Sequence, residues 1–123
     1  MRDYLTIHKH SAGTIGISRY ALAAIARRAA EEITGTTVLS RRGKKGLRRV
    51  FQHSEEFASI APDGVKVVFA KDGRALIKME VSLARGQEVA KTCIRIQESV
   101  ANNFALMCDM VPFDVQVRVA HIV

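Results

Sequence analysis

The sequence predicts a small α+β domain, a two-layer sandwich in which a sheet of three or four strands carries two helices on one face. Two stretches place apolar residues at helical spacing, and three others alternate apolar with polar residues. Their order along the chain corresponds to β-α-β-β-α-β or a close variant. The 123 residues, 48% of them hydrophobic, suffice for one domain, residues 1–123, with a core of its own.

The N-terminal residues give the weakest pattern. Residues 4–9 alternate only at Leu5 and Ile7, which is typical of either a short strand or an ordered arm. Residues 14–18 favour a brief extended segment. Ser18 then provides a side-chain oxygen that is able to accept a hydrogen bond from a free N–H group of a following helix.

The first helix is expected to run from Ser18 to about Thr34, with Gly35 as the left-handed residue that ends it. Its alanines permit close approach to a neighbouring element. The apolar stripe comprises Leu22, Ile25, Ala26, Ala29 and Ile33. The side facing water comprises Arg27, Arg28, Glu31 and Glu32.

Three stretches alternate with a period of two residues, as half-buried strands do. Residues 65–70 and 75–83 are joined through Asp72 and Gly73, a dipeptide that favours a hairpin turn. Residues 113–120 form the third stretch. Residues 37–39 favour a further short extended piece, whereas the rest of residues 36–61 show no clear periodicity.

Residues 86–111 predict the core helix, with Gly86 before it and Pro112 at its end. One continuous stripe comprises Val89, Cys93, Ile96, Val100, Phe104, Met107 and Val111, widened by Ala90, Ile94, Ala101, Ala105 and Cys108. Only a narrow strip is polar. A helix with so much apolar circumference is expected to be largely covered by other elements. If the strands on either side of it are parallel, the connection is a crossover.

The sheet face without helices is expected to be wet and to carry both signs of charge. It comprises Arg74, Lys78, Glu80, Ser82, Asp114, Gln116 and Arg118. Such a face suits a protein partner or simply solvent. Within it, the residues predicted to contact a partner are Arg74, Lys78, Glu80, Gln116 and Arg118.

The net charge of +7 comes almost entirely from one cluster. Six basic residues fall within nine positions, namely Arg41, Arg42, Lys44, Lys45, Arg48 and Arg49. Without them 13 basic and 12 acidic residues remain, a net charge of +1. The basicity is therefore local, and the cluster is expected to lie on a flexible insert at about residues 40–50.

Two polyanions are candidate ligands of this basic cluster. Gly43-Lys44-Lys45-Gly46 matches the Gly-x-x-Gly loop by which KH domains hold a nucleic-acid backbone, so a small RNA-binding module is an alternative interpretation of the chain. That loop normally joins two helices, whereas residues 37–39 are strand-like. Six basic residues, at about 1 kcal/mol each, are also able to hold a protein weakly at an anionic membrane surface.

No catalytic, cofactor-binding or metal-binding set of residues is predicted. Cys93 and Cys108, fifteen positions apart on one helix, would be separated by about 22 Å, too far for a disulfide, and are interpreted as core thiols. His8 and His10 would share a face if residues 4–9 form a strand, but they have no third ligand nearby and are interpreted as surface histidines. The adjacent pairs Glu31-Glu32 and Glu55-Glu56 diverge on a helix and are expected to be solvated.

The sequence predicts a cytoplasmic protein. Its longest apolar runs are far shorter than the ~20 residues that span a bilayer, and its N-terminus lacks the apolar region of a signal peptide. Free cysteines agree with a reducing compartment. A homo-oligomer remains compatible with the sequence.

The chain resembles the alkaline shock protein family of bacteria over residues 13–35 and 64–119. The resemblance rests on Thr14-Ile15-Gly16-Ile17-Ser18, the alanine-rich helix before Gly35, Gly64-Val65, Gly86 with Val89-Ala90, Gln97 and Val100, and the alternating Val115, Val117 and Val119. It implies a non-enzymatic domain linked to envelope stress or envelope homeostasis, which acts through a protein partner and gathers at the membrane through an anchoring one. Residues 109–112 replace the glycine turn usual in the family, and the basic residues 41–49 lie outside its pattern.

Overall fold

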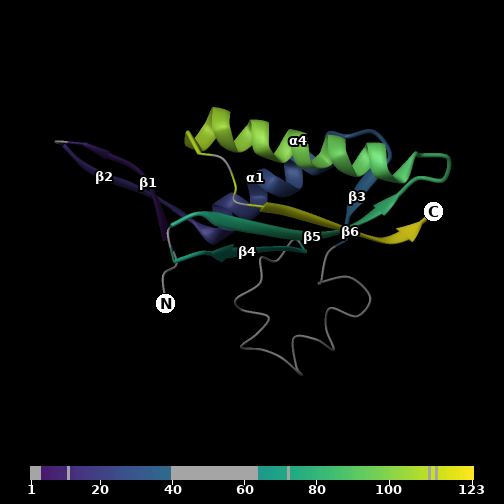
Figure 1. The fold of residues 1–123 in the computed structure, drawn as a ribbon, viewed down its shortest axis with the longest axis horizontal. Helices are drawn as coiled ribbons and strands as arrows, with labels where there is room; N and C mark the ends of the chain where they lie inside the picture. The colour runs from purple at the N-terminus through teal and green to yellow at the C-terminus, as the bar shows by residue number, and fades with distance from the viewer. Residues whose placement is uncertain (1–3, 11, 40–63, 72, 111, 113) are drawn as a thin grey trace, which may run out of the picture.

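The computed structural model describes residues 4–10, 12–39, 64–71, 73–110, 112 and 114–123. In this part of the chain a four-stranded sheet carries two helices on one face, and a two-stranded hairpin stands apart from it (Figure 1). The α+β sandwich predicted from the sequence is confirmed.

Strand β5 (Ala75–Leu83) is the centre of the sheet, because the other three strands all pair with it. Strands β3 (Thr36–Val38) and β4 (Val65–Phe69) run antiparallel to β5, whereas β6 (Asp114–Ile122) runs parallel to it. The connection from β5 to β6 is therefore the parallel crossover that the sequence suggested.

Strands β3 and β4 lie end to end along the same edge of β5. Ile77 of β5 pairs with both Val67 of β4 and Val115 of β6. Farther along β5, Val81 pairs with β3 in place of β4, while β6 continues on the other side. A strand has only two edges, so β6 occupies one edge and the two antiparallel strands share the other.

The turn between β4 and β5 falls where Asp72-Gly73 predicted a reversal. The Ala70 N–H group donates to the Arg74 carbonyl at 2.7 Å, and the Gly73 N–H group donates to the Ala70 carbonyl at 2.9 Å. Gly73 has a φ of 85°, a conformation that glycine adopts without steric cost. The hairpin is confirmed, although Asp72 itself lies outside the described residues.

Helix α1 (Arg19–Glu31) begins as predicted, since the Ser18 side chain accepts a hydrogen bond from the Ala21 N–H group at 3.2 Å. The helix is shorter than expected because it ends at Glu31 and not near Thr34. Gly35 does take a positive φ, 83°, in the turn beyond the helix. A Cβ atom at Gly35 would lie 2.8 Å from the side-chain nitrogen of Gln87, which is the end of a flexible side chain, so the positive φ is the stronger reason for glycine here.

Helix α4 (Val89–Cys108) is also shorter at both ends than the predicted residues 86–111. Pro112 does not end it. Asp109 ends it instead, in the left-handed conformation with φ 54° and ψ 39°. Asp109 thus takes the position in which a glycine is usual at a helix C-terminus, and aspartate is among the few residues that tolerate it.

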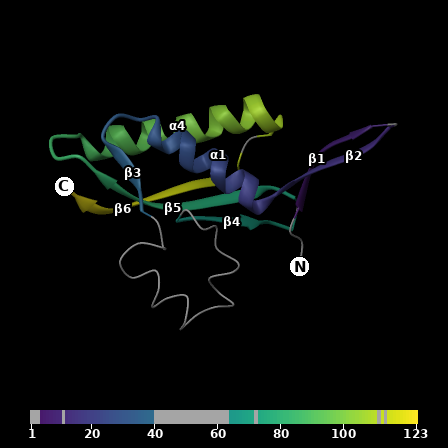
Figure 2. The same ribbon diagram turned by 180° about the vertical axis from the view of Figure 1, so that it is seen from behind.

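The core lies between the two helices and the sheet (Figure 2). On β5 every odd-numbered side chain is buried, as the alternation predicted. The Ser99 hydroxyl of α4 donates to the Ala29 carbonyl of α1 at 2.8 Å and so ties the two helices together. The largest fully buried side chains include Phe104, Leu22, Ile77, Met79, Leu83 and Ile96.

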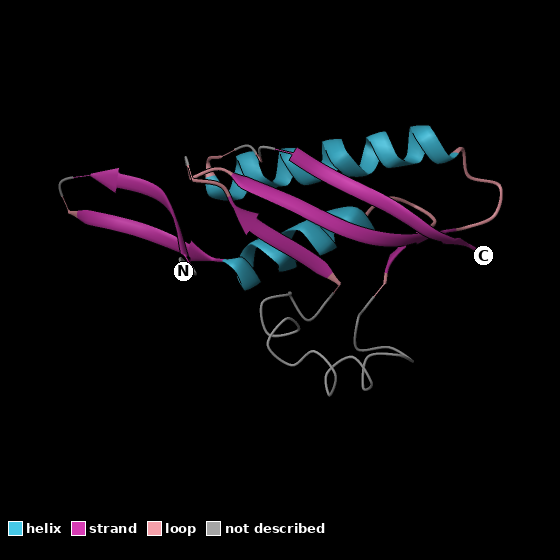
Figure 3. Ribbon diagram, turned by 60° about the horizontal axis from the view of Figure 1, so that its bottom comes forward, coloured by secondary structure: helices cyan, strands magenta, loops and turns pink. Residues whose placement is uncertain are grey.

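Within the described residues, the expectation that other elements largely cover α4 is wrong. The helix buries a single line of residues, Thr92, Ile96, Val100, Phe104 and Cys108. Several apolar side chains outside that line are exposed, among them Ile94 at 52%, Leu106 at 85% and Met107 at 64%. The physical reason is the two-layer architecture, because within the described residues α4 packs on the sheet below and α1 beside it and has nothing on its outer side (Figure 3).

The N-terminal hairpin consists of β1 (Tyr4–His10) and β2 (Gly13–Ser18), paired antiparallel. The strand alternative for residues 4–9 is therefore the right one. The hairpin projects from the main sheet (Figure 1). The buried side chain of Leu5 fixes its base to the domain.

Candidate functional site

The open face of the sheet, opposite the helices, carries the side chains that the sequence assigned to it. Arg74, Lys78, Gln116 and Arg118 are exposed, and Glu80 is half-buried. Strand register places Lys78 beside Gln116, and Glu80 beside Arg118. Four of the five predicted partner-contacting residues therefore belong to one continuous surface, and Arg74 lies in the turn just before β5.

Ser82 is an exception on this face. The sequence places it among the wet residues, but only 7% of it is exposed. Its register partners, Thr37 on β3 and His121 on β6, flank it on both sides. Ser82 lies where strands cover both edges of β5, next to an irregularity in the β5–β6 register, and it is thereby removed from the accessible surface.

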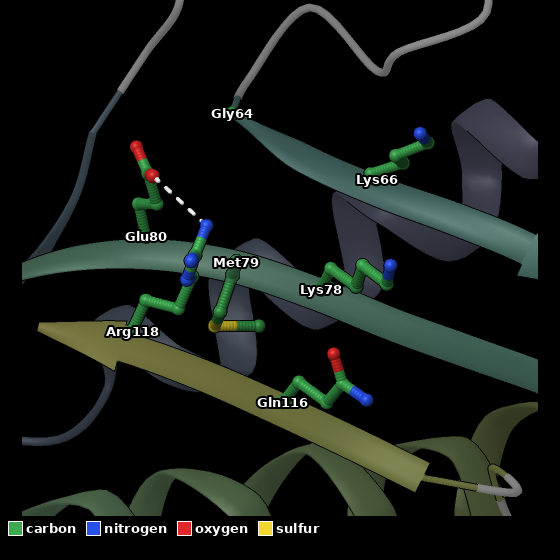
Figure 4. Close-up of a pocket in the computed structure, with 7 residues that line it drawn as sticks. All are labelled: Gly64, Lys66, Lys78, Met79, Glu80, Gln116 and Arg118. Atoms are coloured by element: carbon green, nitrogen blue, oxygen red, sulfur yellow. Dashed lines mark ion pairs between the residues drawn. The ribbon is translucent and has the colours of Figure 1, made fainter.

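A hollow of about 380 Å³ lies in the middle of the open face. Figure 4 shows its lining residues, which are Gly64, Lys66, Lys78, Met79, Glu80, Gln116 and Arg118. Across it the Arg118 Nη1 atom lies 4.0 Å from the Glu80 Oε2 atom. Because the Arg118 side chain is 80% exposed, this ion pair contributes little stability and leaves the guanidinium able to exchange partners.

The two lysines of the hollow face each other across neighbouring strands. Lys66 of β4 is the register partner of Lys78 of β5, and like charges directly opposite one another are unfavourable by roughly 0.2–1 kcal/mol. Within the described part of the chain no carboxylate forms an ion pair with either ammonium group. The hollow thus presents positive charge that an anionic group would neutralise.

Lys66 and Gly64 are members of the site that sequence reasoning missed. The signal was present, since the hairpin at residues 72–73 fixes the register of β4 against β5 and so places residue 66 opposite residue 78. The six basic residues at positions 41–49, predicted to contact a polyanion, lie outside the described residues.

Neither cysteine is poised as a nucleophile. Cys108 is buried and Cys93 is half-buried, and burial raises the pKa of both thiols. A raised pKa keeps a thiol protonated at neutral pH, and the thiolate is the reactive form. Both residues pack as small apolar groups on α4.

No group of three or more His, Cys, Asp or Glu residues in the described part of the chain is arranged to hold a metal ion. None of the described helices combines the length and hydropathy that a membrane crossing needs. The hollow of the open face presents three cations, the Glu80 carboxylate and the Gln116 amide.

Comparison with known proteins decides the family. A family model described as having a cell envelope-related function matches residues 7–123, nearly the whole chain. The chain belongs to the alkaline shock protein family. The resemblance seen in the sequence is thereby confirmed, and this alkaline shock family domain includes the β1–β2 hairpin from Ile7 onward. No curated protein and no solved structure matches the chain.

Proposed function

We propose that this alkaline shock family domain is a non-enzymatic interaction module that serves its envelope-related function by binding a protein partner through the open face of the sheet. The observation that carries the proposal is the hollow in which Lys66 and Lys78 stand side by side with Arg118 nearby. These side chains suit a partner that inserts one or more carboxylates.

The non-enzymatic character of the domain is part of the proposal. The open face offers long, solvated cations and an amide, groups that bind anions by charge and hydrogen bonding. The partner would be an envelope-associated protein, one anchored in the membrane, that recruits the domain from the cytoplasm to the membrane surface. In this account the domain takes part in envelope stress response or envelope homeostasis.

The test is recovery of crosslinked partners from the protein's own cells. The open-face variant carries Lys66→Glu and Lys78→Glu. The matched control carries Arg85→Glu and Lys91→Glu, the same change in charge on exposed positions just before α4 and in its first turn. The proposal expects the wild type and the control to retain one set of envelope proteins that the open-face variant loses.

Equal recovery with all three proteins would show that the open face does not bind the partner. Circular dichroism of each variant checks that the fold is retained. Addition of salt gives a second readout, since an interaction that depends on exposed charges weakens as screening increases.

A further inference from the structure

Within the described part of the chain, most backbone groups on the outer edge of β6 have no partner. Leu39, the residue after β3, donates from its N–H group to the Glu80 carbonyl at 2.9 Å. The backbone N–H and C=O groups of the even-numbered residues of β5 therefore point towards β3 and β4. The backbone N–H and C=O groups of the odd-numbered residues of β5 point towards β6, as the hydrogen bond from the Val123 N–H group to the Leu83 carbonyl shows. In a parallel pair, the residues of β6 that lie opposite these odd-numbered residues direct their own backbone groups away from β5.

Those register partners are Val115, Val117 and Val119. Their N–H and C=O groups are therefore directed away from β5. Among the described residues one group is satisfied, the Val115 carbonyl, which accepts from the Gln97 side chain of α4 at 2.9 Å. Val117 and Val119 remain open for pairing with another strand.

The side of α4 next to this edge is apolar. Gln97 points towards β6, whereas Ser99 points towards α1, because each donates a hydrogen bond in that direction. Residues 90, 94 and 101 lie on the Gln97 side of the helix at 100° per residue. They are Ala90 and Ile94, both exposed, and Ala101, which is half-buried.

The same edge is open on its helix-facing side. Val117 and Val119 turn towards the helix layer but are only half-buried, unlike the equivalent residues of β5. An unpaired strand edge, half-covered valines and an apolar helix flank thus form one continuous surface. The parts of this surface lie alongside one another, because the axis of α4 follows β6 in the opposite chain direction (Figure 3).

We propose that this surface binds a second copy of the chain. The two β6 strands pair antiparallel about a twofold axis, which joins the sheets into one, and the two α4 helices lie side by side above the junction. A twofold arrangement suits the surface because every element of it is met by the same element of the second copy. Small residues such as Ala90 and Ala101 allow the helices to approach closely.

Charge places the axis at Gln116. With Gln116 opposite Gln116 of the second copy, Asp114 lies opposite Arg118 of the second copy, and the pair occurs twice. The helix layer fits this register. Gln97 of α4 lies beside Val115 of β6. One residue farther along β6 is a step of about 3.3 Å, which equals about two residues of the antiparallel helix at about 1.5 Å each. Gln116 therefore lies beside about residue 95, next to Ile94.

The inference goes beyond the proposed function and does not depend on it. The interface uses an edge of the sheet and the flank of a helix, and it shares Gln116 and Arg118 with the open face that the proposed partner binds. A dimer of this kind would present two open faces side by side and so engage a partner with two sites more tightly than a monomer would.

The first experiment measures association of the full chain by sedimentation equilibrium. The interface variant is Ile94→Glu, and the matched control is Leu106→Glu, an exposed apolar residue on the same helix about 120° away from Ile94. The wild type and the control are expected to form dimers, and Ile94→Glu is expected to weaken the dimer by roughly tenfold or more. A wild type that is monomeric at all accessible concentrations, or equal losses in both variants, overturns the proposal.

The second experiment tests β6 pairing and its register. Gln116→Cys is expected to give a disulfide-linked dimer under mild oxidation, because opposite residues in such a pair lie about 4.5 Å apart, within disulfide reach. Arg118→Cys is the control, since its two copies would be about 13 Å apart along the strands. Equal crosslinking of the two variants overturns the pairing.

A third variant keeps the test valid if a cysteine disturbs the fold. Val117→Pro removes an N–H group that the monomer does not use, so the pairing of β6 with β5 is retained. The expected result is a folded monomer by circular dichroism and sedimentation. A folded Val117→Pro dimer of wild-type affinity contradicts the proposal.

Discussion

The two helices cover the same sheet but bury different fractions of themselves. Helix α1 buries five of its 13 residues, four of them alanines, and its outer side carries charged residues. Helix α4 has 20 residues and also buries only five, while Ile94, Leu106 and Met107 remain exposed. The described part of the chain therefore leaves much more apolar surface uncovered on α4 than on α1.

The sharpest contrast is expected within α4 itself. Phe104→Ala should lower the free energy of unfolding by about 3–5 kcal/mol, because Phe104 is fully buried and its removal leaves a cavity. Leu106→Ala should change it by less than about 0.5 kcal/mol, because that side chain is solvated. Chemical denaturation of both variants measures the difference, and similar losses would contradict the assignment of inner and outer sides.

The close contact of α1 with the core predicts the next largest effect. Ala26→Leu should cost about 1–3 kcal/mol of unfolding free energy, since Ala26 is fully buried and there is no room for a longer side chain. Ala24→Leu, at an exposed position two residues earlier, serves as the control. If Ala26→Leu melted at the wild-type temperature, α1 would not be as closely packed as described.

Glu31 links α1 to the sheet and predicts a smaller effect. Its carboxylate lies 3.4 Å from the Arg27 side chain and accepts a hydrogen bond from the Val38 N–H group at 3.2 Å. Glu31 is exposed, as expected, and its carboxylate also has these two partners. Glu31→Ala should lower stability by about 1 kcal/mol, whereas Glu32→Ala should have little effect. Thermal melts of both variants measure the two effects, and equal melting temperatures would contradict the role of Glu31.

Asp109 predicts the smallest effect, and a stabilising one. Its left-handed conformation is more costly for aspartate than for glycine, so Asp109→Gly should raise stability by up to about 1 kcal/mol. Asp109→Val should lower it, since β-branched residues disfavour a positive φ. A lower melting temperature for Asp109→Gly would mean that the aspartate side chain contributes more than its backbone strain costs.

The sheet could be predicted from the sequence because its signals are local. Alternation identified β4, β5 and β6, and the Asp72-Gly73 turn fixed the pairing of the first two. The arrangement of β3 and β4 along one edge of β5 could not be predicted, since it depends on contacts between residues far apart in the chain. The β1–β2 pairing was missed for a different reason, because the apolar residues of these two strands alternate too weakly to identify it.

The periodicity of α4 predicted a helix correctly but not its environment. A helical pattern records which residues are apolar, and it does not record whether the same chain or another covers them. Ile94 and Cys108 both widen the stripe in the sequence, yet one is exposed and the other buried. The open face was predicted because it follows from alternation, whereas its hollow required the register of Lys66 with Lys78.

Hydrogen exchange at the amides of β6 tests most directly whether a second copy covers the open side of α4 and β6. The Gln116 and Arg118 amides point towards β5 and should be protected at every protein concentration. The account predicts that the Val117 amide becomes protected as concentration rises and loses that protection in Ile94→Glu. A Val117 amide that exchanges rapidly at all concentrations, beside protected Gln116 and Arg118 amides, would contradict it.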